Sequence, residues 1–416
     1  MRKIHRFGMV IATVAVLLLL LLCTPLLIDR LGGDFDRDPE DGEWLFSEAA
    51  NALIQASFEG IEPGTLRDYH THLLGLGEDP HRAYVHEHSF SWLHPLQLFR
   101  NRIYLSAAGV TDRDQADARY LARLVRLIRA TPGFGRYHLL AYDKHYLADG
   151  TVDESRTRFY VSNEYVFEVA ERYPDLFIPV ASIHPYREDA IAALNKWASK
   201  GVRMIKWLPN AQGIDPADPR LLPFYEAMQA HGMVLLTHTG EEKAVEAGEQ
   251  QDFGNPLLLR QPLGVGVKVI AAHAASLGAH PDLDDPDRPI VPAYKLLLRL
   301  MDEKRYDGLL FAEISAITMH HRAEEALLAL LQRPDLHHRL VNGSDYPVSA
   351  VNMLISLDQL SEMGVLDETL QPALREIYHT NPLLFDFVLK RSLRLPSTDL
   401  GFDVSVFTTR SGLHTR

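Results

Sequence analysis

Eight short apolar runs, each with a polar residue at or near its end and a helical segment after it, constrain the fold of this chain most strongly. Runs of this length that are rich in aliphatic and β-branched residues are typical of strands buried on both faces, and hence of parallel strands. The runs are LRDYH (66–70), YHLLAYD (137–143), LFIPVASIH (176–184), GVRMIKW (201–207), GMVLLTH (232–238), VKVIAAH (267–273), GLLFAEI (308–314) and RLVNGSD (339–345).

Between the runs, apolar residues recur with a helical period. Residues 187–199 carry one such stripe, formed by Ala190, Ile191, Leu194, Trp197 and Ala198. Similar stripes occur in residues 115–130 and 322–333. Eight strand–helix units in one chain predict an α/β fold, a closed (β/α)8 TIM barrel. The alternative is a doubly wound open sheet, but no glycine-rich phosphate loop follows the first strand.

We expect the barrel to occupy residues 61–395, after a linker and short helix at 31–60 and before a C-terminal tail at 396–416. Two connections are long. Residues 73–115 follow the first strand and are rich in histidine and aromatic residues, and residues 274–292 follow the sixth strand and are acidic and proline-rich. Both leave the strand ends where barrel active sites lie, so both are candidate lids or substrate walls.

The N-terminal residues 1–30 have the pattern of a membrane anchor. Arg2, Lys3 and Arg6 precede an uncharged stretch over residues 8–28, close to the roughly 20 residues that span a bilayer. The stretch is longer than the apolar core of most cleaved signals, and no A-x-A follows it. We therefore predict an uncleaved anchor helix rather than a cleaved signal. Because basic residues stay cytoplasmic, the rest of the chain is expected on the extracytoplasmic side, periplasmic or extracellular.

Composition excludes several partners and chemistries. The formal net charge is −13, and such an acidic chain repels phosphate backbones, so we expect no nucleic-acid partner. Cys23 is the only cysteine, which excludes an intramolecular disulfide and a thiolate metal site. Any metal must therefore be held by His, Asp, Glu or a modified Lys.

The strongest chemical signal is DYHTH, residues 68–72. Residues two apart on a strand point the same way, so His70 and His72 can hold one ion from a single strand end. On its own, this pair is explained equally well as two incidental histidines in a chain that has 20 of them.

Four more polar residues lie at or near the ends of other apolar runs: Lys206 in the fourth, His238 in the fifth, His273 in the sixth and Asp345 in the eighth. The C-terminal ends of barrel strands meet at one mouth, so these groups should converge with the DYHTH histidines. Buried imidazoles and a carboxylate without a cation would carry a large desolvation cost. Neutral imidazole with carboxylate oxygen suits Zn²⁺, Fe²⁺ or Mn²⁺, and we predict a divalent transition metal, zinc first, as one or two ions.

The sequence resembles the amidohydrolase superfamily, most closely the amidohydrolase-related branch that includes the aminocarboxymuconate-semialdehyde-type decarboxylases. The resemblance covers about residues 61–390 and rests on five segments: DYHTH, GVRMIKWLP with the following DPADPRLLPFYEAMQAHGMVLLTHTG, AAHAA, NGSDYP and HTNPLLFDF. It implies a set of metal ligands made up of His70, His72, His238 and Asp345.

The resemblance leaves two residues with open roles. It implies that His273 is either a ligand of a second metal or a proton donor to the substrate. It also implies that Lys206 stands where binuclear members carry a carboxylated lysine that bridges two metals. Trp207-Leu208-Pro209 departs from the Lys-Leu-His-Pro form usual in relatives and alters the wall beside this lysine, so its modification stays open.

The expected reaction is hydrolysis of an amide, ester or lactone bond of a small molecule by a metal-activated water, with Asp345 as general acid and base. The alternative is a metal-dependent non-oxidative decarboxylase of a small carboxylic acid, which would use one metal and His273 as proton donor and would not need Lys206. A second alternative is a catalytically inactive, membrane-tethered binding protein, and the intact ligand set counts against it.

Other polar residues near the strand ends carry less weight. Glu313 is expected either to form a structural pair or to support a metal-bound histidine. Glu241 and Glu242 are expected to be solvated, and His320 and His321 to open a helix without a catalytic role. The residues expected to line the mouth are Asp143, Lys144, His145 and His184.

Overall fold

The computed structural model describes residues 26–35, 44–110, 114–410 and 412–413, and in these ranges the eight predicted runs form parallel strands. One sheet has three strands in the order β1-β3-β5, and a second has five in the order β12-β11-β8-β7-β6. The strands are β1 (Arg67–His72), β3 (Arg136–Leu140), β5 (Phe177–Val180), β6 (Met204–Trp207), β7 (Val234–His238), β8 (Lys268–Ala272), β11 (Leu310–Glu313) and β12 (Leu340–Val341).

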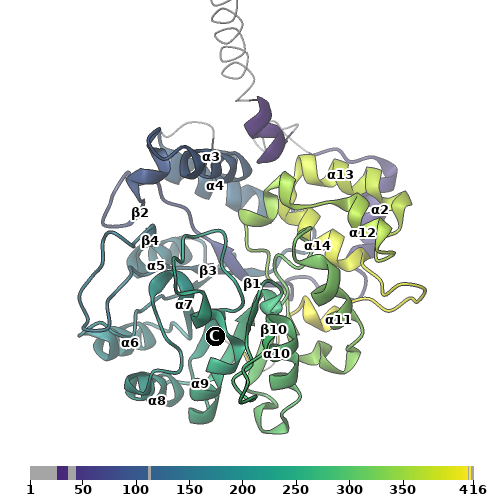
Figure 1. The fold of residues 1–416 in the computed structure, drawn as a ribbon. Coiled ribbons are helices and arrows are strands. Elements are labelled where there is room, and N and C mark those ends of the chain that lie inside the picture. The colour runs from purple at the N-terminus through teal and green to yellow at the C-terminus, as the bar shows by residue number, and fades with distance from the viewer. Residues whose placement is uncertain (1–25, 36–43, 111–113, 411, 414–416) are drawn as a thin grey trace, which may run out of the picture.

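The two sheets join at both ends and close into one barrel. Ala181, just after β5, forms a parallel bridge with Ile205 of β6. At the other junction, the Tyr69 N–H of β1 donates to the Asn342 carbonyl after β12, at 2.9 Å. The strands lie at the centre of the molecule with helices around them (Figure 1). The predicted (β/α)8 barrel is confirmed.

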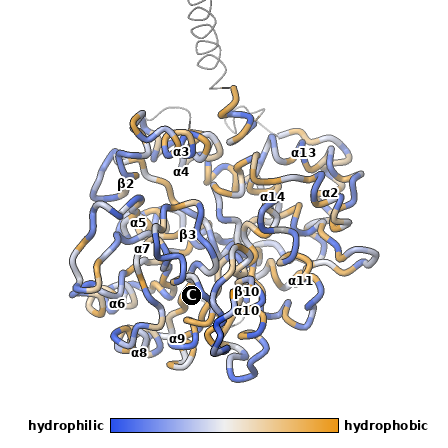
Figure 2. The backbone as a smooth tube through the Cα atoms, viewed as in Figure 1, coloured by the Kyte–Doolittle hydropathy of each residue, from blue (hydrophilic) through white to orange (hydrophobic). Residues whose placement is uncertain are grey.

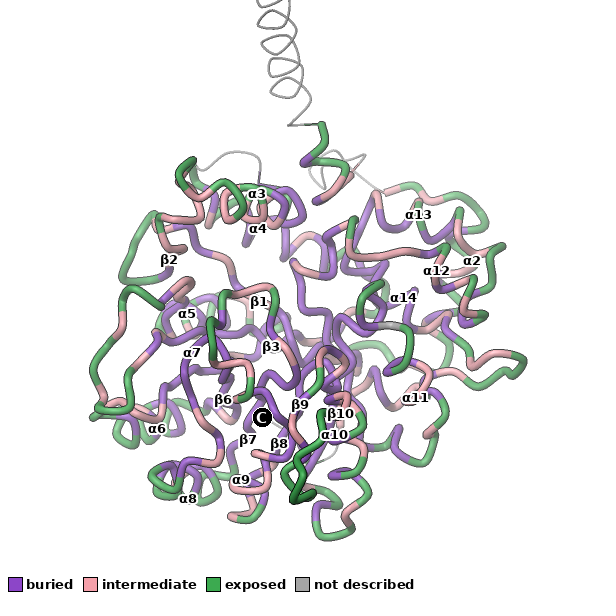
Figure 3. The backbone as a smooth tube through the Cα atoms, in the orientation of Figure 1, coloured by how far each residue is buried: buried purple, intermediate pink, exposed green. Residues whose placement is uncertain are grey.

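Helices follow each strand and cover the outside of the barrel. Figure 3 shows the central strands buried and the outer edges of these helices exposed. Hydropathy alternates along the same helices, as Figure 2 shows, because one side of each faces the sheet. The helices are α3 (Pro95–Ala107), α4 (Ala116–Arg129), α5 (Asn163–Arg172), α6 (Ala190–Ser199), α7 (Pro209–Gln212), α8 (Leu222–Ala230), α9 (Arg260–Val265), α10 (Ala293–Met301), α11 (Leu328–Leu331), α12 (Leu357–Glu362), α13 (Gln371–Thr380) and α14 (Pro382–Ser392).

The predicted helical stripes agree with these bounds, with two differences in detail. On α6 the stripe is buried except at Ile191, which is 42% exposed, so the buried face is narrower than predicted. The segment predicted at 322–333 begins with a π-helical turn, Ala323–Leu327, before α11. Both differences leave the order of strands and helices unchanged.

The long connections carry structure of their own. Residues 73–115 hold the strand β2 (Ala83–Val85), the 3-10 turn η2 (Glu87–Phe90) and α3, and β2 pairs with β4 (Phe159–Val161). Residues 274–292 contain the antiparallel pair β9 (Ala279–Pro281) and β10 (Ile290–Pro292).

Alternation along the strands decides which side chains enter the barrel. Met204 of β6 and Leu236 of β7 belong to the core inside the barrel, whereas Ile205 packs outside against the helices. Successive strand residues point to opposite faces, so Lys206 and His238, two residues further along, also point inward. They lie above the interior core, toward the C-terminal ends of the strands.

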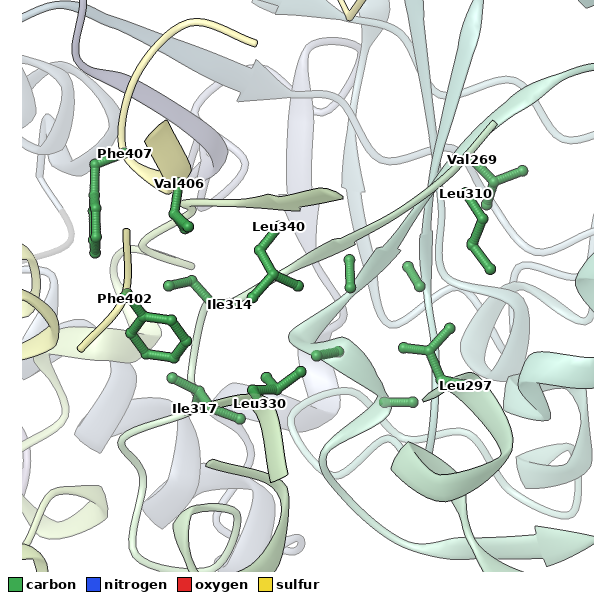
Figure 4. Close-up of a cluster of buried hydrophobic side chains, with 14 of the residues drawn as sticks. Val269, Leu297, Leu310, Ile314, Ile317, Leu330, Leu340, Phe402, Val406 and Phe407 are labelled. Atoms are coloured by element: carbon green, nitrogen blue, oxygen red, sulfur yellow. The ribbon is translucent and has the colours of Figure 1, made fainter. Parts of the chain in front are cut away.

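The C-terminal segment packs onto the barrel instead of extending away from it. Figure 4 shows Phe402 and Val406 beside Ile314 and Leu340, on the outer side of the last strands. The Val406 carbonyl accepts from Asn342 N at 2.8 Å, and the carbonyl of its neighbour Phe407 accepts from the N–H of the first β1 residue at 2.9 Å. This segment therefore ties the first and last strands together.

The predicted anchor, residues 1–30, lies almost wholly outside the described residues; residues 26–31 are helical. Within the described ranges, no helix combines the length and the apolar character needed to cross a bilayer. The short helix expected in the linker corresponds to α2 (Glu48–Ser57), which packs on α13 and α14.

Candidate metal centre

Three of the predicted metal ligands meet directly at the mouth of the barrel. His72 Nε2 lies 2.9 Å from Asp345 Oδ1, and His70 Nε2 lies 3.5 Å from the same oxygen. The Nζ of Lys206 lies 3.3 Å from His70 Nε2. Ligand atoms of the two histidines and Asp345 all lie within 4.8 Å of one another, close enough to share one ion.

The backbone around Asp345 explains why a residue so far along the chain reaches β1. Its N–H donates to the His70 carbonyl at 2.7 Å, which holds the end of β12 against β1. Asp345 has φ 58°, in the left-handed region, where Asp is tolerated better than most residues. Beside it, the buried Asp68 carboxylate accepts from the backbone N–H groups of His70 and Ser344.

Glu313 of β11 determines the orientation of His70. Its carboxylate lies 3.0 Å from His70 Nδ1 and accepts from His273 N at 3.2 Å and from the N–H and hydroxyl of Ser315. As a carboxylate it only accepts, so the His70 proton is on Nδ1 and Nε2 carries a lone pair. Burial raises the pKa of Glu313 to about 7, opposed by Lys390 and by these hydrogen bonds.

The donor atoms fit a metal ion. Burial lowers the pKa of His70, His238 and His273 well below the usual value, so these imidazoles are neutral. The lone pair of His70 Nε2 therefore faces an oxygen of Asp345, with the Lys206 Nζ beside it at 3.3 Å. A metal cation between the imidazole and the carboxylate would be attracted to both acceptors, and imidazole with carboxylate is a ligand set that divalent transition metals accept.

His273 follows β8 in a strained turn, η6 (His273–Ala275), whose three residues all have positive φ. Such a conformation costs about 1–2 kcal/mol for each non-glycine residue. The ring lies 5.0 Å, centre to centre, from the ring of His70, and its Nδ1 lies 2.7 Å from Ser315 Oγ. The one hydroxyl proton of Ser315 goes to Glu313, so Ser315 accepts from His273 Nδ1 and the Nε2 lone pair remains available.

His238 joins the cluster but has partners of its own. Its ring centre lies 5.0 Å from that of His273. Its Nδ1 lies 3.2 Å from Glu242 Oε2, and its Nε2 lies 3.3 Å from the Glu241 carbonyl. His238 is therefore next to His273, and its nitrogens face the loop that follows β7.

Glu242 was predicted to be solvated, and this prediction is wrong. Its side chain is buried against His238, and its carboxylate accepts from the N–H groups of Ala244 and Val245. Gln251 hydrogen-bonds both its N–H and its carbonyl, so the loop holds this carboxylate in place. Its neighbour Glu241 is only partly buried, and its side chain lies 3.4 Å from the ammonium of a lysine.

Lys206 is buried beside His70. Burial lowers the pKa of its ammonium to about 8, although Asp345, Glu313 and Glu242 all act in the opposite direction. A larger fraction of its amine is therefore neutral at neutral pH than for an exposed lysine.

Arg322, in the segment after β11, is a charged residue that the sequence did not single out. Its guanidinium is buried, and Nη1 donates to Ser276 Oγ at 3.2 Å, three residues after His273. Its Nε has no hydrogen-bond partner among the described residues. After burial, Arg322 is the largest influence that lowers the pKa of both His238 and His273, which places its charge beside the cluster.

The remaining predicted residues lie in the wall around this cluster. His184 is buried, with Nε2 donating to the Gln212 carbonyl at 2.8 Å. Asp143 accepts from His184 N and forms an ion pair with Arg187 at 2.9 Å. These two residues build the rim and have no direct contact with the metal ligands. Other contacts away from the cluster are Lys144 with Glu154, His145 with Gln250, and His320 with His321.

A family model described as Amidohydrolase matches residues 68–383 of the chain. No match was found among curated proteins. Among solved structures, the chain is similar to an uncharacterized TIM-barrel protein from Bordetella bronchiseptica, with 19% identity, a TM-score of 0.47, and coverage of 77% of this chain and 99% of that chain.

Two further structures share less of the sequence or superpose less closely. A Pseudomonas putida protein named as a 2-pyrone-4,6-dicarboxylic acid hydrolase has 19% identity and a TM-score of 0.41, over 78% of this chain and 98% of that chain. A 5-carboxyvanillate decarboxylase from Novosphingobium aromaticivorans, with bound manganese, has 13% identity and a TM-score of 0.42, over 78% of this chain and 98% of that chain.

Proposed function

Because this chain belongs to the amidohydrolase family, we propose that it is a metal-dependent hydrolase that cleaves an amide, ester or lactone bond of a small molecule with an activated water. The resemblance predicted from the sequence is confirmed by the family match over residues 68–383. The observation that carries the proposal is the approach of His70 Nε2 and His72 Nε2 to one oxygen of Asp345. Imidazoles around a carboxylate provide a site for a cation and a place for a water beside it.

We propose that His70, His72 and Asp345 hold the metal, with His238 and His273 as the adjacent ligands, and that the metal is zinc. A divalent metal in such a site polarises a carbonyl oxygen and lowers the pKa of a water to about 7. Asp345 then takes a proton from the attacking water and returns it to the leaving group.

A second ion would need a further ligand between the two metals, and Lys206 is the candidate. Its neutral amine reacts with carbon dioxide to give a carbamate and a proton, and burial makes the neutral amine more abundant by lowering the pKa of Lys206 to about 8. The carbamate would stand beside His70, since Nζ lies 3.3 Å from His70 Nε2.

Arg322 supplies the positive charge for substrate binding in this proposal. Its guanidinium is buried near the cluster, and its Nε has no hydrogen-bond partner among the described residues. An anionic group on the substrate would accept a hydrogen bond from this Nε and so offset the desolvation cost of the buried group. Its hydrogen bond to Ser276 fixes it next to the turn that holds His273.

Metal content tests the ligand assignment. Elemental analysis of the purified protein should find one or two divalent ions per chain, and His70→Ala or His238→Ala should weaken metal binding by orders of magnitude. Wild-type metal content in both variants would refute the assignment. Mass spectrometry of the intact protein reports whether Lys206 carries the additional carboxyl group.

The second candidate function is decarboxylation of a small carboxylic acid. It is favoured by the two candidate ligand groups, His70 with His72 and Asp345, and His70 with His273 and Glu313, because they share His70 and so suit a single metal. Hydrolysis and decarboxylation are distinguished by a panel of lactones, amides, esters and carboxylic acids in ¹⁸O-labelled water. A hydrolase incorporates solvent oxygen into the organic product. A decarboxylase releases carbon dioxide, and its organic product contains no solvent oxygen. A metal-loaded protein that turns over none of them would favour an inactive binding protein.

A further inference from the structure

Four large apolar side chains are exposed together on α3 and the turn before it. Trp92 and Leu96 are each 80% exposed, Leu93 is 68% exposed and Phe99 is 37% exposed. Leu96 and Phe99 are three residues apart on α3 and so lie on one face of the helix, and Trp92 and Leu93 lie in the turn just before it. We call these four residues the α3 surface.

The α3 surface differs from the other exposed apolar residues of the barrel helices. Elsewhere these residues are isolated on their helices, as with Ile191 on α6 and Leu222 on α8, and single residues of this kind are normal. A cluster that includes a tryptophan is unusual in water and common where a protein meets a partner or a lipid interface.

The C-terminal end of α3 packs against the start of the described chain. Ser106 of α3 accepts from Gly33 N at 3.1 Å, and its hydroxyl lies 3.4 Å from the Asp29 carboxylate. Just before these contacts, Leu26 and Leu27 are exposed at the end of the uncharged stretch over residues 8–28. The described start of the chain thus lies beside the C-terminal end of α3, on the same side of the molecule as this helix (Figure 1).

The same helix also adjoins the metal centre. Arg100 of α3 donates to the Lys243 carbonyl at 3.3 Å, in the loop whose Glu242 contacts His238. Tyr104 lies close enough to Glu242 and Asp345 for both carboxylates to raise its pKa, after the larger effect of burial. One face of α3 is therefore exposed and apolar, while another borders the mouth of the barrel.

We propose that the α3 surface contacts the lipid bilayer and holds the mouth of the barrel at the membrane. The apolar side chains would enter the boundary between headgroups and acyl chains, where tryptophan is favoured, and the exposed Arg102 on the same helix would meet an anionic headgroup. Leu26 and Leu27, which lie next to the predicted anchor, are also exposed, and the segment that follows them packs on the C-terminal end of the same helix. This proposal holds whichever bond the enzyme cleaves.

A second copy of the chain is a less suitable occupant. A stable protein interface needs about 20–30 residues on each side, and the α3 surface offers four large apolar side chains. A bilayer needs no complementary shape, so a short apolar stripe beside a membrane-directed segment is sufficient.

Tryptophan fluorescence tests the proposal in the full chain. The protein is reconstituted in vesicles of phosphatidylcholine and phosphatidylglycerol, with and without bromine on the phosphatidylcholine acyl chains. Trp197 and Trp207 are buried and Trp44 is half-buried, so their emission should change less than that of Trp92. We expect the brominated lipid to quench Trp92 strongly, and Trp92→Phe, a mild change at an exposed site, to remove most of the quenching.

The matched control is Leu222→Trp in the Trp92→Phe background. Leu222 is an exposed apolar residue at the start of α8, which lies far from α3 in Figure 1. A tryptophan there should be quenched far less than Trp92. Equal quenching at the two positions would overturn the proposal. So would a Trp92 that the lipid does not quench but that becomes shielded as protein concentration rises, which would assign the surface to a second copy.

Discussion

Asp345 is the residue that separates a working active site from a barrel that only binds metal. Asn keeps the shape and one oxygen ligand, but it cannot take a proton from water. We therefore predict that Asp345→Asn lowers turnover by about 10²–10⁴ while much of the metal remains. The matched control is Asp143→Asn, a strand-end carboxylate paired with Arg187, which should retain most of the turnover. Near-normal turnover in Asp345→Asn would show that this residue is a ligand and not the base.

Arg322 should decide whether the enzyme prefers anionic substrates. A hydrogen bond to a charged group is worth about 1.5–3 kcal/mol, which corresponds to about 10–100-fold in kcat/KM. We expect Arg322→Met to lower kcat/KM by this factor for an anionic substrate and to change kcat/KM little for the neutral methyl ester of the same substrate. Arg322→Lys should restore part of it, because the charge returns without the planar fork. Equal losses on both substrates would indicate a structural role only.

The sequence predicted the residues at strand ends better than those in loops. His70 and Asp345 could be placed because parallel strands bring their C-terminal ends to one mouth. Glu242 and Arg322 could not, since they lie in loops without a periodic pattern, and the burial of Glu242 depends on hydrogen bonds from Gln251. The proton position on His70 depends on Glu313, for which the sequence left two roles open.

At the scale of the elements, β3 and the end of β5 each contribute a buried histidine to the barrel wall. Burial lowers the pKa of His138 and of His184 to about 3. In the unfolded chain each takes up a proton near pH 6.5, so their contribution to stability is complete above that pH and is lost as pH falls toward 3.

We therefore predict that the free energy of unfolding decreases as pH falls from 7 to 4, by about 1.4 kcal/mol per pH unit for each such histidine. Urea unfolding at several pH values measures this slope. His184→Gln keeps a donor for the Gln212 carbonyl and removes one titrating group, so its slope should be smaller by that amount. The same slope in wild type and variant would contradict the assignment.

The elements themselves were predictable to different degrees. The strands were recognisable because both of their faces are apolar, inside the barrel and against the helices. Residues 402–407 were expected to form a tail, yet Val406 and Phe407 pair with the backbones near β12 and β1. The few apolar residues of this segment have no helical or strand-like spacing. The surface that they cover exists only when the barrel is complete.

For the whole molecule, we predict that residues 1–30 remain attached and hold the catalytic barrel outside the cytoplasm. The basis is the uncharged stretch over residues 8–28, with basic residues only before it. Fractionation should find the full chain in the membrane after an alkaline wash, with the barrel accessible to protease from the extracytoplasmic side. A soluble mature protein that starts after residue 23 would contradict this prediction.

The junction between β1 and β12 has a consequence for biosynthesis. Ser344 N donates to Asp68, and the two residues are 276 positions apart in the sequence. The first strand, β1, therefore cannot pair with β12 until most of the chain has left the ribosome. At about 5–20 residues per second this takes tens of seconds. During that time the nascent β1 presents an unpaired edge, which is a site for aggregation or for a chaperone. His70 and Asp345 therefore meet only at the end of synthesis, and an interrupted chain has no metal centre.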